Sequence, residues 1–292
     1  MDIETIGNLV RAEFRKVLST KLWWALLIPT AALTFLYALI WSALGVGVVE
    51  SLTDSPVYEQ AGVDLQDTAI SVFGLARAIN IGTIFPMLLG GLALPTEIRH
   101  RTITTSYLTA PTRMSVLTAK LITYPIWGLL YGLVISLSAS AGIALGSKDN
   151  TGLLPPAAGW LQIVGTGLLE SVLWTLVGVG VGALLRNVVG TSITLLMYSI
   201  AVENLVALGL PWKVAGYLPN QAADGMTSSL AGEVFLHSTT LLDQVDFRNE
   251  AIQILAGARG ALDWWLSGLI FLGYAAVFVV FGWLANRNRD IT

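Results

Sequence analysis

The chain has 292 residues, of which 54% are hydrophobic and 12% are charged, and its formal net charge is −3. Soluble domains carry roughly 25% charged residues, so this composition excludes an ordinary soluble domain and indicates a membrane protein. The sequence contains no cysteine, which excludes disulfides and thiolate metal sites without identifying a compartment.

The N-terminal residues 1–22 are expected to stay attached, because they are charged and no short apolar core with a small-residue cleavage site follows them. Apolar residues recur here near helical period, while Arg11, Arg15 and Lys16 fall largely on another face. This pattern predicts an amphipathic elbow helix in the membrane interface, with its basic groups at anionic headgroups. Two interpretations remain open: a simple cytoplasmic anchor, or an elbow helix that also contacts a partner protein.

Six apolar stretches follow, each long enough to cross a hydrocarbon core of ~30 Å as a helix of ~20 residues. We therefore predict an all-α, polytopic membrane protein that forms a single transmembrane domain over residues 1–292. The expected spans are 23–48, 71–95, 115–146, 160–185, 189–210 and 262–285.

The basic residues are distributed unevenly over the loops between these spans. With the N-terminus inside, eleven of the sixteen lysines and arginines lie on the cytoplasmic side and five outside. Acidic residues crowd the first and last outer loops instead. By the positive-inside rule, both termini are predicted to be cytoplasmic.

The loop between the second and third spans, 97–113, mixes charged residues with hydroxyl and apolar ones. Its threonines and serine can cap a short helix, and Pro111 would end that helix before the next span begins. The residues alone leave two possibilities open: an ordinary basic loop, or a short helix that docks a soluble partner.

The elbow segment Arg11 to Lys16, the Trp23-Trp24 pair and the 97–113 loop together resemble the membrane subunits of ABC-2-type ATP-binding-cassette transporters. The likeness is to the actinobacterial branch of multidrug and antibiotic exporters. The family pattern in the loop is an acid, a Gly-Thr pair, then Pro-x-Arg and a lysine at the next helix. The matching residues are Glu97, Thr102, Pro111, Arg113 and Lys120, with Arg99 between them; Arg101 stands where glycine is usual.

The resemblance implies a permease in the bacterial cell membrane that pairs with a second permease chain, identical or related, and docks an ATPase subunit. Residues 97–113 would form the coupling helix, and 211–261 an extracellular segment of short outer helices. ATP and Mg would bind the ATPase, and the cargo would be a hydrophobic or amphipathic drug, antibiotic or lipid. The residues implied in coupling are Glu97, Arg99, Arg101, Thr102, Pro111 and Arg113.

The sequence lacks the motifs of other functional classes. There is no G-x-x-x-x-G-K-[ST] phosphate-binding loop, so this chain is expected to bind no cofactor and to catalyse no hydrolysis itself. The two histidines are far apart, and the basic residues flank the spans, so neither a metal site nor a nucleic-acid surface is expected. Two rival functions remain: a proton-coupled secondary transporter, and a non-transporting membrane scaffold or sensor.

Three ionisable residues lie at membrane depth: Arg77, Glu170 and Glu203. Charges there cost ~2.5–3.5 kcal/mol on insertion scales, so each should face protein or water. We expect Arg77 to pair with Glu203, at similar depth, or with the deeper Glu170. Substrate recognition and a proton relay are the alternatives.

Small residues recur every fourth position on the second and third spans, which predicts close helix–helix contact or, alternatively, a groove facing the substrate. They are Gly74, Ala78, Gly82, Pro86 and Gly90 on the second span, and Gly128, Gly132, Ser136, Ser140 and Ala144 on the third.

Overall fold

The computed structural model describes residues 3–53, 68–102, 113–148, 151–238 and 250–288, and the elements in these ranges are helical. Six helical segments are long and apolar enough to cross a membrane, so the chain is a multi-pass membrane protein. Each of the six predicted spans corresponds to one of these segments, with ends that differ by a few residues. The observed segments are Leu22–Ser51, Ser71–Gly91, Ser115–Gly146, Ala157–Leu185, Val188–Gly209 and Trp264–Arg287.

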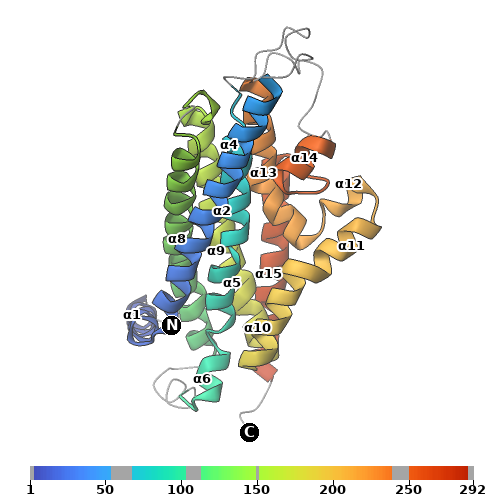
Figure 1. The fold of residues 1–292 in the computed structure, drawn as a ribbon. Coiled ribbons are helices and arrows are strands. Elements are labelled where there is room, and N and C mark those ends of the chain that lie inside the picture. Colours follow the sequence, from blue (N-terminus) through green and yellow to red (C-terminus); the bar gives the residue numbers. More distant parts are fainter. Residues whose placement is uncertain (1–2, 54–67, 103–112, 149–150, 239–249, 289–292) are drawn as a thin grey trace.

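The long helices form one bundle (Figure 1). α2 (Leu22–Thr53) packs along α8 (Arg113–Gly146), and α9 (Ala157–Leu185) contacts α8, α5 and α15 (Trp264–Asn288). The outward faces carry exposed leucine, isoleucine and valine side chains, as expected of helices that contact lipid. α1 (Ile3–Ser19), α6 (Pro95–Arg99) and the C-terminal end of α15 lie at the same end of the bundle (Figure 1).

The second span is broken into α4 (Ser71–Gly82) and α5 (Ile84–Gly91), which meet at Thr83. Pro86 lies in the first turn of α5. Amide hydrogens in the first turn of a helix have no acceptor within the helix, so proline, which lacks one, is tolerated there. The helix therefore restarts just before the proline instead of continuing through it. Near the end of this span, α6 extends the chain toward the loop.

The fifth span is also irregular. α10 (Val188–Met197) begins at Asn187, whose side chain accepts a hydrogen bond from the amide of Gly190 at 2.8 Å. A π-helical turn, η2 (Tyr198–Val202), then separates α10 from α11 (Glu203–Gly209). Such turns occur often at functional sites.

The segment before the last span differs from the expectation of short outer helices. α12 (Trp212–Ala215) and α14 (Glu250–Ala256) are short, but α13 (Pro219–Ser238) has 20 residues. Most of α13 is buried, and it packs against α4, α9 and α15 inside the bundle (Figure 1). A short 3-10 turn, η1 (Thr151–Leu153), precedes α9.

The small residues of the second and third spans lie in helix–helix contacts within the chain, which favours the packing interpretation. A Cβ atom on Gly90 would lie 2.2 Å from the carbonyl oxygen of Thr175, and one on Gly128 would lie 2.5 Å from the Thr175 hydroxyl. The partner helix α9 has its own glycines at the same contact, such as Gly178. Glycine on both sides lets the backbones approach closely.

Candidate functional site

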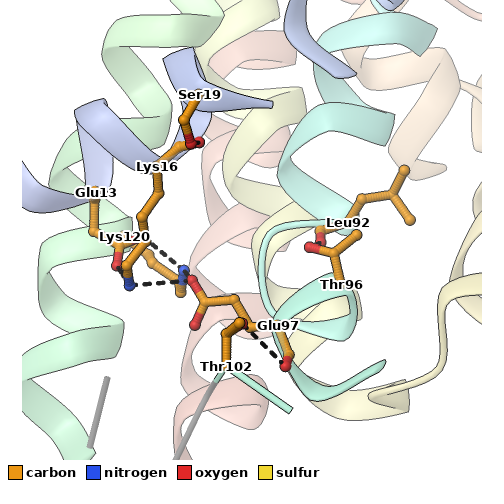
Figure 2. Close-up of polar contacts among 8 residues, drawn as sticks. All are labelled: Glu13, Lys16, Ser19, Leu92, Thr96, Glu97, Thr102 and Lys120. Carbon is orange, nitrogen blue, oxygen red and sulfur yellow. Dashed lines mark hydrogen bonds and ion pairs between the residues drawn. The ribbon is translucent and has the colours of Figure 1, made fainter. Parts of the chain in front are cut away.

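Four charged side chains from three helices meet at the end of the bundle that carries α1 and α6. Glu13 and Lys16 lie on α1, Glu97 on α6 and Lys120 on α8 (Figure 2). We call these four residues the charge cluster. It joins the helix before the first span to both helices that flank the basic loop.

Lys120 is the centre of the charge cluster. Its Nζ lies 2.7 Å from Oε2 of Glu13 and 2.6 Å from Oε1 of Glu97. Lys16 completes the cluster from the exposed side, at 2.5 Å from Glu13 and 3.3 Å from Glu97 (Figure 2). The Lys120 side chain is 0% exposed and that of Glu13 is 4% exposed, whereas that of Lys16 is 41% exposed.

The electrostatics of the charge cluster are balanced, because two carboxylates face two ammonium groups. Burial alone would raise the pKa of Glu13, but the charges of Lys120 and Lys16 and their hydrogen bonds outweigh it, so that the pKa lies below its usual value. Oε2 of Glu97 is buried without a hydrogen-bond partner among the described residues. The ion pairs therefore depend on the three helices keeping their relative positions.

The backbone that positions Glu97 ends in a Schellman motif. The amide of Thr102 donates to the carbonyl of Glu97 at 3.0 Å, and the amide of Arg101 donates to that of Ile98 at 3.1 Å. Arg101 adopts a left-handed conformation with φ of 58°, which favours glycine. Arg101 therefore occupies a backbone conformation that suits glycine, the residue usual at this position in ABC-2-type permeases.

A cavity of about 470 Å³ adjoins the charge cluster between α1, α5, α6 and α8. Leu89, Leu92 and Ala93 form its apolar part, and Glu13, Lys16 and Glu97 lie at its polar side. The Thr96 hydroxyl, which also lines it, donates to the carbonyl of Leu92 at 2.6 Å (Figure 2). The cavity shows that α1 is not packed tightly against the bundle along its whole length.

The remaining predicted residues of the elbow helix and of the coupling loop are placed as follows. Arg11 and Arg15 are exposed on α1, and Arg99 is exposed at the end of α6. Thr102 donates from its hydroxyl to the carbonyl of Glu97 at 3.3 Å. Pro111 lies outside the described residues, as does the greater part of the predicted coupling helix, and Arg113 begins α8.

Sequence reasoning missed Glu13 and did not assign Lys120 to a site. The available signal for Glu13 was an acid three residues before Lys16, on a helix whose neighbouring positions Phe14 and Val17 are apolar. For Lys120 the signal was a lysine followed by Leu121 and Tyr124, well inside an apolar helix. A buried lysine requires an acidic partner, and Glu13 and Glu97 are the partners found.

The predicted pairing of Arg77 with an intramembrane acid is not formed. Arg77 donates from Nε to the carbonyl of Leu255 at 2.6 Å, hydrogen-bonds the carbonyl of Ile254, and stacks over the Trp41 ring at 4.6 Å. These carbonyls end α14, where a cation is favoured by the helix dipole. Backbone carbonyls thus take the role that the sequence suggested for an acid.

The two acids are stabilised differently from one another. Glu203 accepts hydrogen bonds from the amides of Asn220 and Gln221, both at 2.8 Å, and so caps the first turn of α13. Glu170 on α9 is 0% exposed, and neither of its oxygens has a hydrogen-bond partner among the described residues. The side chains of Trp174 and Thr83 are the polar groups close enough to interact with it.

Comparisons with known proteins add no family assignment: no protein-family model matches the chain, and no curated protein matches it significantly. The function must therefore be argued from the residues and their geometry.

Proposed function

We propose that this chain is the transmembrane permease subunit of an ATP-driven ABC exporter in a bacterial cell membrane, with both termini in the cytoplasm. The observation that carries the proposal is the charge cluster. It joins α1, α6 and α8 through a lysine that is 0% exposed, beside a basic loop rich in hydrogen-bonding side chains. A soluble partner that moves the loop would then move the first three spans together.

The partner must supply the energy, because the sequence contains no phosphate-binding loop of the Walker type. ATP and Mg would bind that ATPase subunit, and the exposed basic residues Arg99 and Arg101 would contact it, while Glu97 would brace the loop from within the charge cluster. A second permease chain would complete the transport pathway. The exported cargo would be a hydrophobic or amphipathic drug, antibiotic or lipid, in keeping with the apolar composition of the bundle.

Purification of the tagged chain from native membranes in a mild detergent, followed by mass identification, tests this proposal. We expect a stoichiometric ATPase with Walker motifs, and export by the reconstituted complex only in the presence of ATP. An ATPase variant with its Walker lysine replaced should bind but not support export. A chain that purifies alone, or an ATPase that responds to no cargo, would contradict the proposal, and the latter result would favour a scaffold or sensor.

A second candidate function is proton-coupled transport, and the fully buried Glu170 favours it. A carboxyl group buried within a span can carry a proton between two states of a transporter. This reading predicts uptake or efflux driven by a pH gradient in vesicles without nucleotide, and loss of that activity in Glu170→Gln. Activity that requires ATP and survives Glu170→Gln would exclude it.

A further inference from the structure

A second cavity, of about 650 Å³, lies within the membrane-spanning part of the bundle, away from the charge cluster. Its lining residues come from α2, α4, α5, α10, η2, α11 and α13. The two irregular spans therefore both border it, at the break near Thr83 and at the π-helical turn.

One wall of this cavity is apolar and includes two aromatic rings. Tyr37 on α2 and Phe85 on α5 line it together with Ile84, Leu88 and Leu196. Such a wall suits the hydrocarbon part of a ligand, because apolar surface leaves water there.

The other part of the wall is polar, and most of its groups are already engaged within the protein. Asn80 accepts from the Thr227 hydroxyl at 2.5 Å and donates to the Ser228 hydroxyl at 3.3 Å. Arg77 is held by the carbonyls of α14 and by Trp41. Its nitrogen atoms are thus engaged by the protein, although the side chain still borders the cavity.

Asp224 on α13 is the exception in that wall. Its carboxylate lines the cavity, is half-buried, and receives a single hydrogen bond among the described residues, from Nδ2 of Asn220 at 3.3 Å. The fully buried Glu170 lies close enough to Asp224 for the two carboxyl groups to interact electrostatically. Among the described residues no cation lies within ion-pair distance of either acid, and the charge of Arg77, which is bound to the carbonyls of α14, acts on Asp224 only at longer range.

We propose that this cavity binds a cationic amphiphile, whose positive group lies at Asp224 and whose apolar body lies against Tyr37, Phe85 and Ile84. The step from ligand to exported cargo rests on the proposed function; the binding itself does not. An anionic ligand would be repelled by the Asp224 carboxylate, and a neutral one would leave that carboxylate with only the longer-range charge of Arg77 in a medium where charge is costly. The aromatic rings add attraction for a cation through their π faces.

Equilibrium dialysis of radiolabelled tetraphenylphosphonium against the purified chain in lipid nanodiscs tests the inference, with empty nanodiscs as the background. We expect saturable binding, at least about tenfold weaker in Asp224→Asn and retained in Asp224→Glu. Glu233→Gln, which removes an acid from the same helix outside the cavity, should bind like the unmodified chain. Neutral triphenylphosphine oxide should bind weakly and equally to all four proteins.

A second experiment, protection of a cysteine from modification, locates the bound ligand even if Asp224→Asn fails to fold. Because the chain has no cysteine, a single one can be placed at the cavity as Ile200→Cys, or outside it as Lys213→Cys. Tetraphenylphosphonium should slow maleimide modification of the first variant by severalfold and leave the second unchanged. Equal rates at both sites, or equal affinity of a well-folded Asp224→Asn, would overturn the inference.

These measurements need neither nucleotide nor ATPase, so they separate the inference from the proposed function. Cation binding by a chain that associates with no ATPase would contradict the proposed exporter function and would still support the cation-binding site. An associated ATPase in a complex that binds no cation would contradict this inference alone.

Discussion

Lys120 brings its ammonium group between the carboxylates of Glu13 and Glu97 at a place where its side chain is 0% exposed. Removing a buried charge is costly when its partners remain, because they lose compensation without regaining water. The charge cluster is thus a point where a single substitution should separate three helices.

We predict that Lys120→Met lowers the free energy of unfolding by about 3 kcal/mol, since two carboxylates would remain buried around an apolar side chain. Thermal unfolding in detergent measures the effect. Lys21→Met, which removes an exposed lysine at the start of the first span, is the control and should have little effect. Adding Glu13→Gln and Glu97→Gln to Lys120→Met should restore part of the loss; no restoration would mean that the ion pairs are not the cause.

The charge cluster should also give a pH dependence to stability. The pKa of Glu13 in the folded protein lies below its unfolded value of 4.5, so the carboxylate stabilises the fold above about pH 4.5. That contribution is lost as the pH falls through the folded pKa. The difference in unfolding free energy between the unmodified chain and Glu13→Gln should therefore shrink below pH 4.5, and a difference independent of pH would contradict the assignment.

A substitution at Arg101 is expected to raise stability, whereas the substitution at Lys120 is expected to lower it. A residue with a side chain costs roughly 1–2 kcal/mol in the left-handed region, so Arg101→Gly should strengthen the end of α6 by about 0.5–1 kcal/mol. Hydrogen exchange at the amide of Thr102, which bonds to Glu97, reports this directly and should slow. Arg99→Gly, inside the helix, should instead speed it.

At this scale the sequence identified charged residues but not their partners. Glu97 and Lys16 could be named from their positions, whereas Glu13 was overlooked because a lone acid on a basic helix gives no signal of burial. The partners of Arg77 are backbone carbonyls, which a search for complementary side chains cannot find. Partner choice depends on the tertiary arrangement, which spacing along the chain does not contain.

At the scale of elements, close glycine contacts hold the bundle together, and α5 against α9 is among the tightest of them. A Cβ atom on Gly178 would lie 2.1 Å from the carbonyl oxygen of Met87 and 2.8 Å from the amide nitrogen of Gly91. Because the obstacles are backbone atoms, side-chain rotation cannot relieve the clash.

Gly178→Ala should therefore lower the free energy of unfolding by about 1–3 kcal/mol, the usual effect of overpacking. Gly165→Ala on the same helix is the matched control, since nothing lies within 4 Å of its position and stability should stay equal or rise. Thermal unfolding of both variants in the same detergent makes the comparison. Equal losses would show that helix propensity, not contact, governs this helix.

The six spans could be predicted from the sequence because the length of an apolar stretch is enough to identify a membrane-spanning helix. The breaks were less accessible: Pro86 indicated one in the second span, but the π-helical turn in the fifth has no comparable residue signal. The burial of α13 was also missed, since its many small and polar residues resemble those of an outer loop. Those residues are accommodated by hydrogen bonds to the spans around them, such as those from Thr227 and Ser228 to other helices.

At the scale of the whole molecule, two separate features support a transporter driven from one end. The charge cluster fixes three helices where the basic loop begins, and a cavity lined by the acid Asp224 lies between the two broken spans. A change in the first can reach the second through α4 and α5, which are continuous with α6 along the chain. Such a device moves cargo only if its two states bind the cargo differently.

Cross-linking from a single cysteine in native membranes tests most directly whether the α6 end of the bundle contacts an ATPase subunit in the cytoplasm. Arg99→Cys places the only thiol of the chain on the exposed end of α6, beside the charge cluster. With a short photoactivatable maleimide, we predict a cross-link to an ATP-hydrolysing subunit with Walker motifs, which nucleotide changes in yield, and none from Lys213→Cys in the segment before the last span. Labelling of Arg99→Cys by an impermeant reagent added outside intact cells would contradict the account.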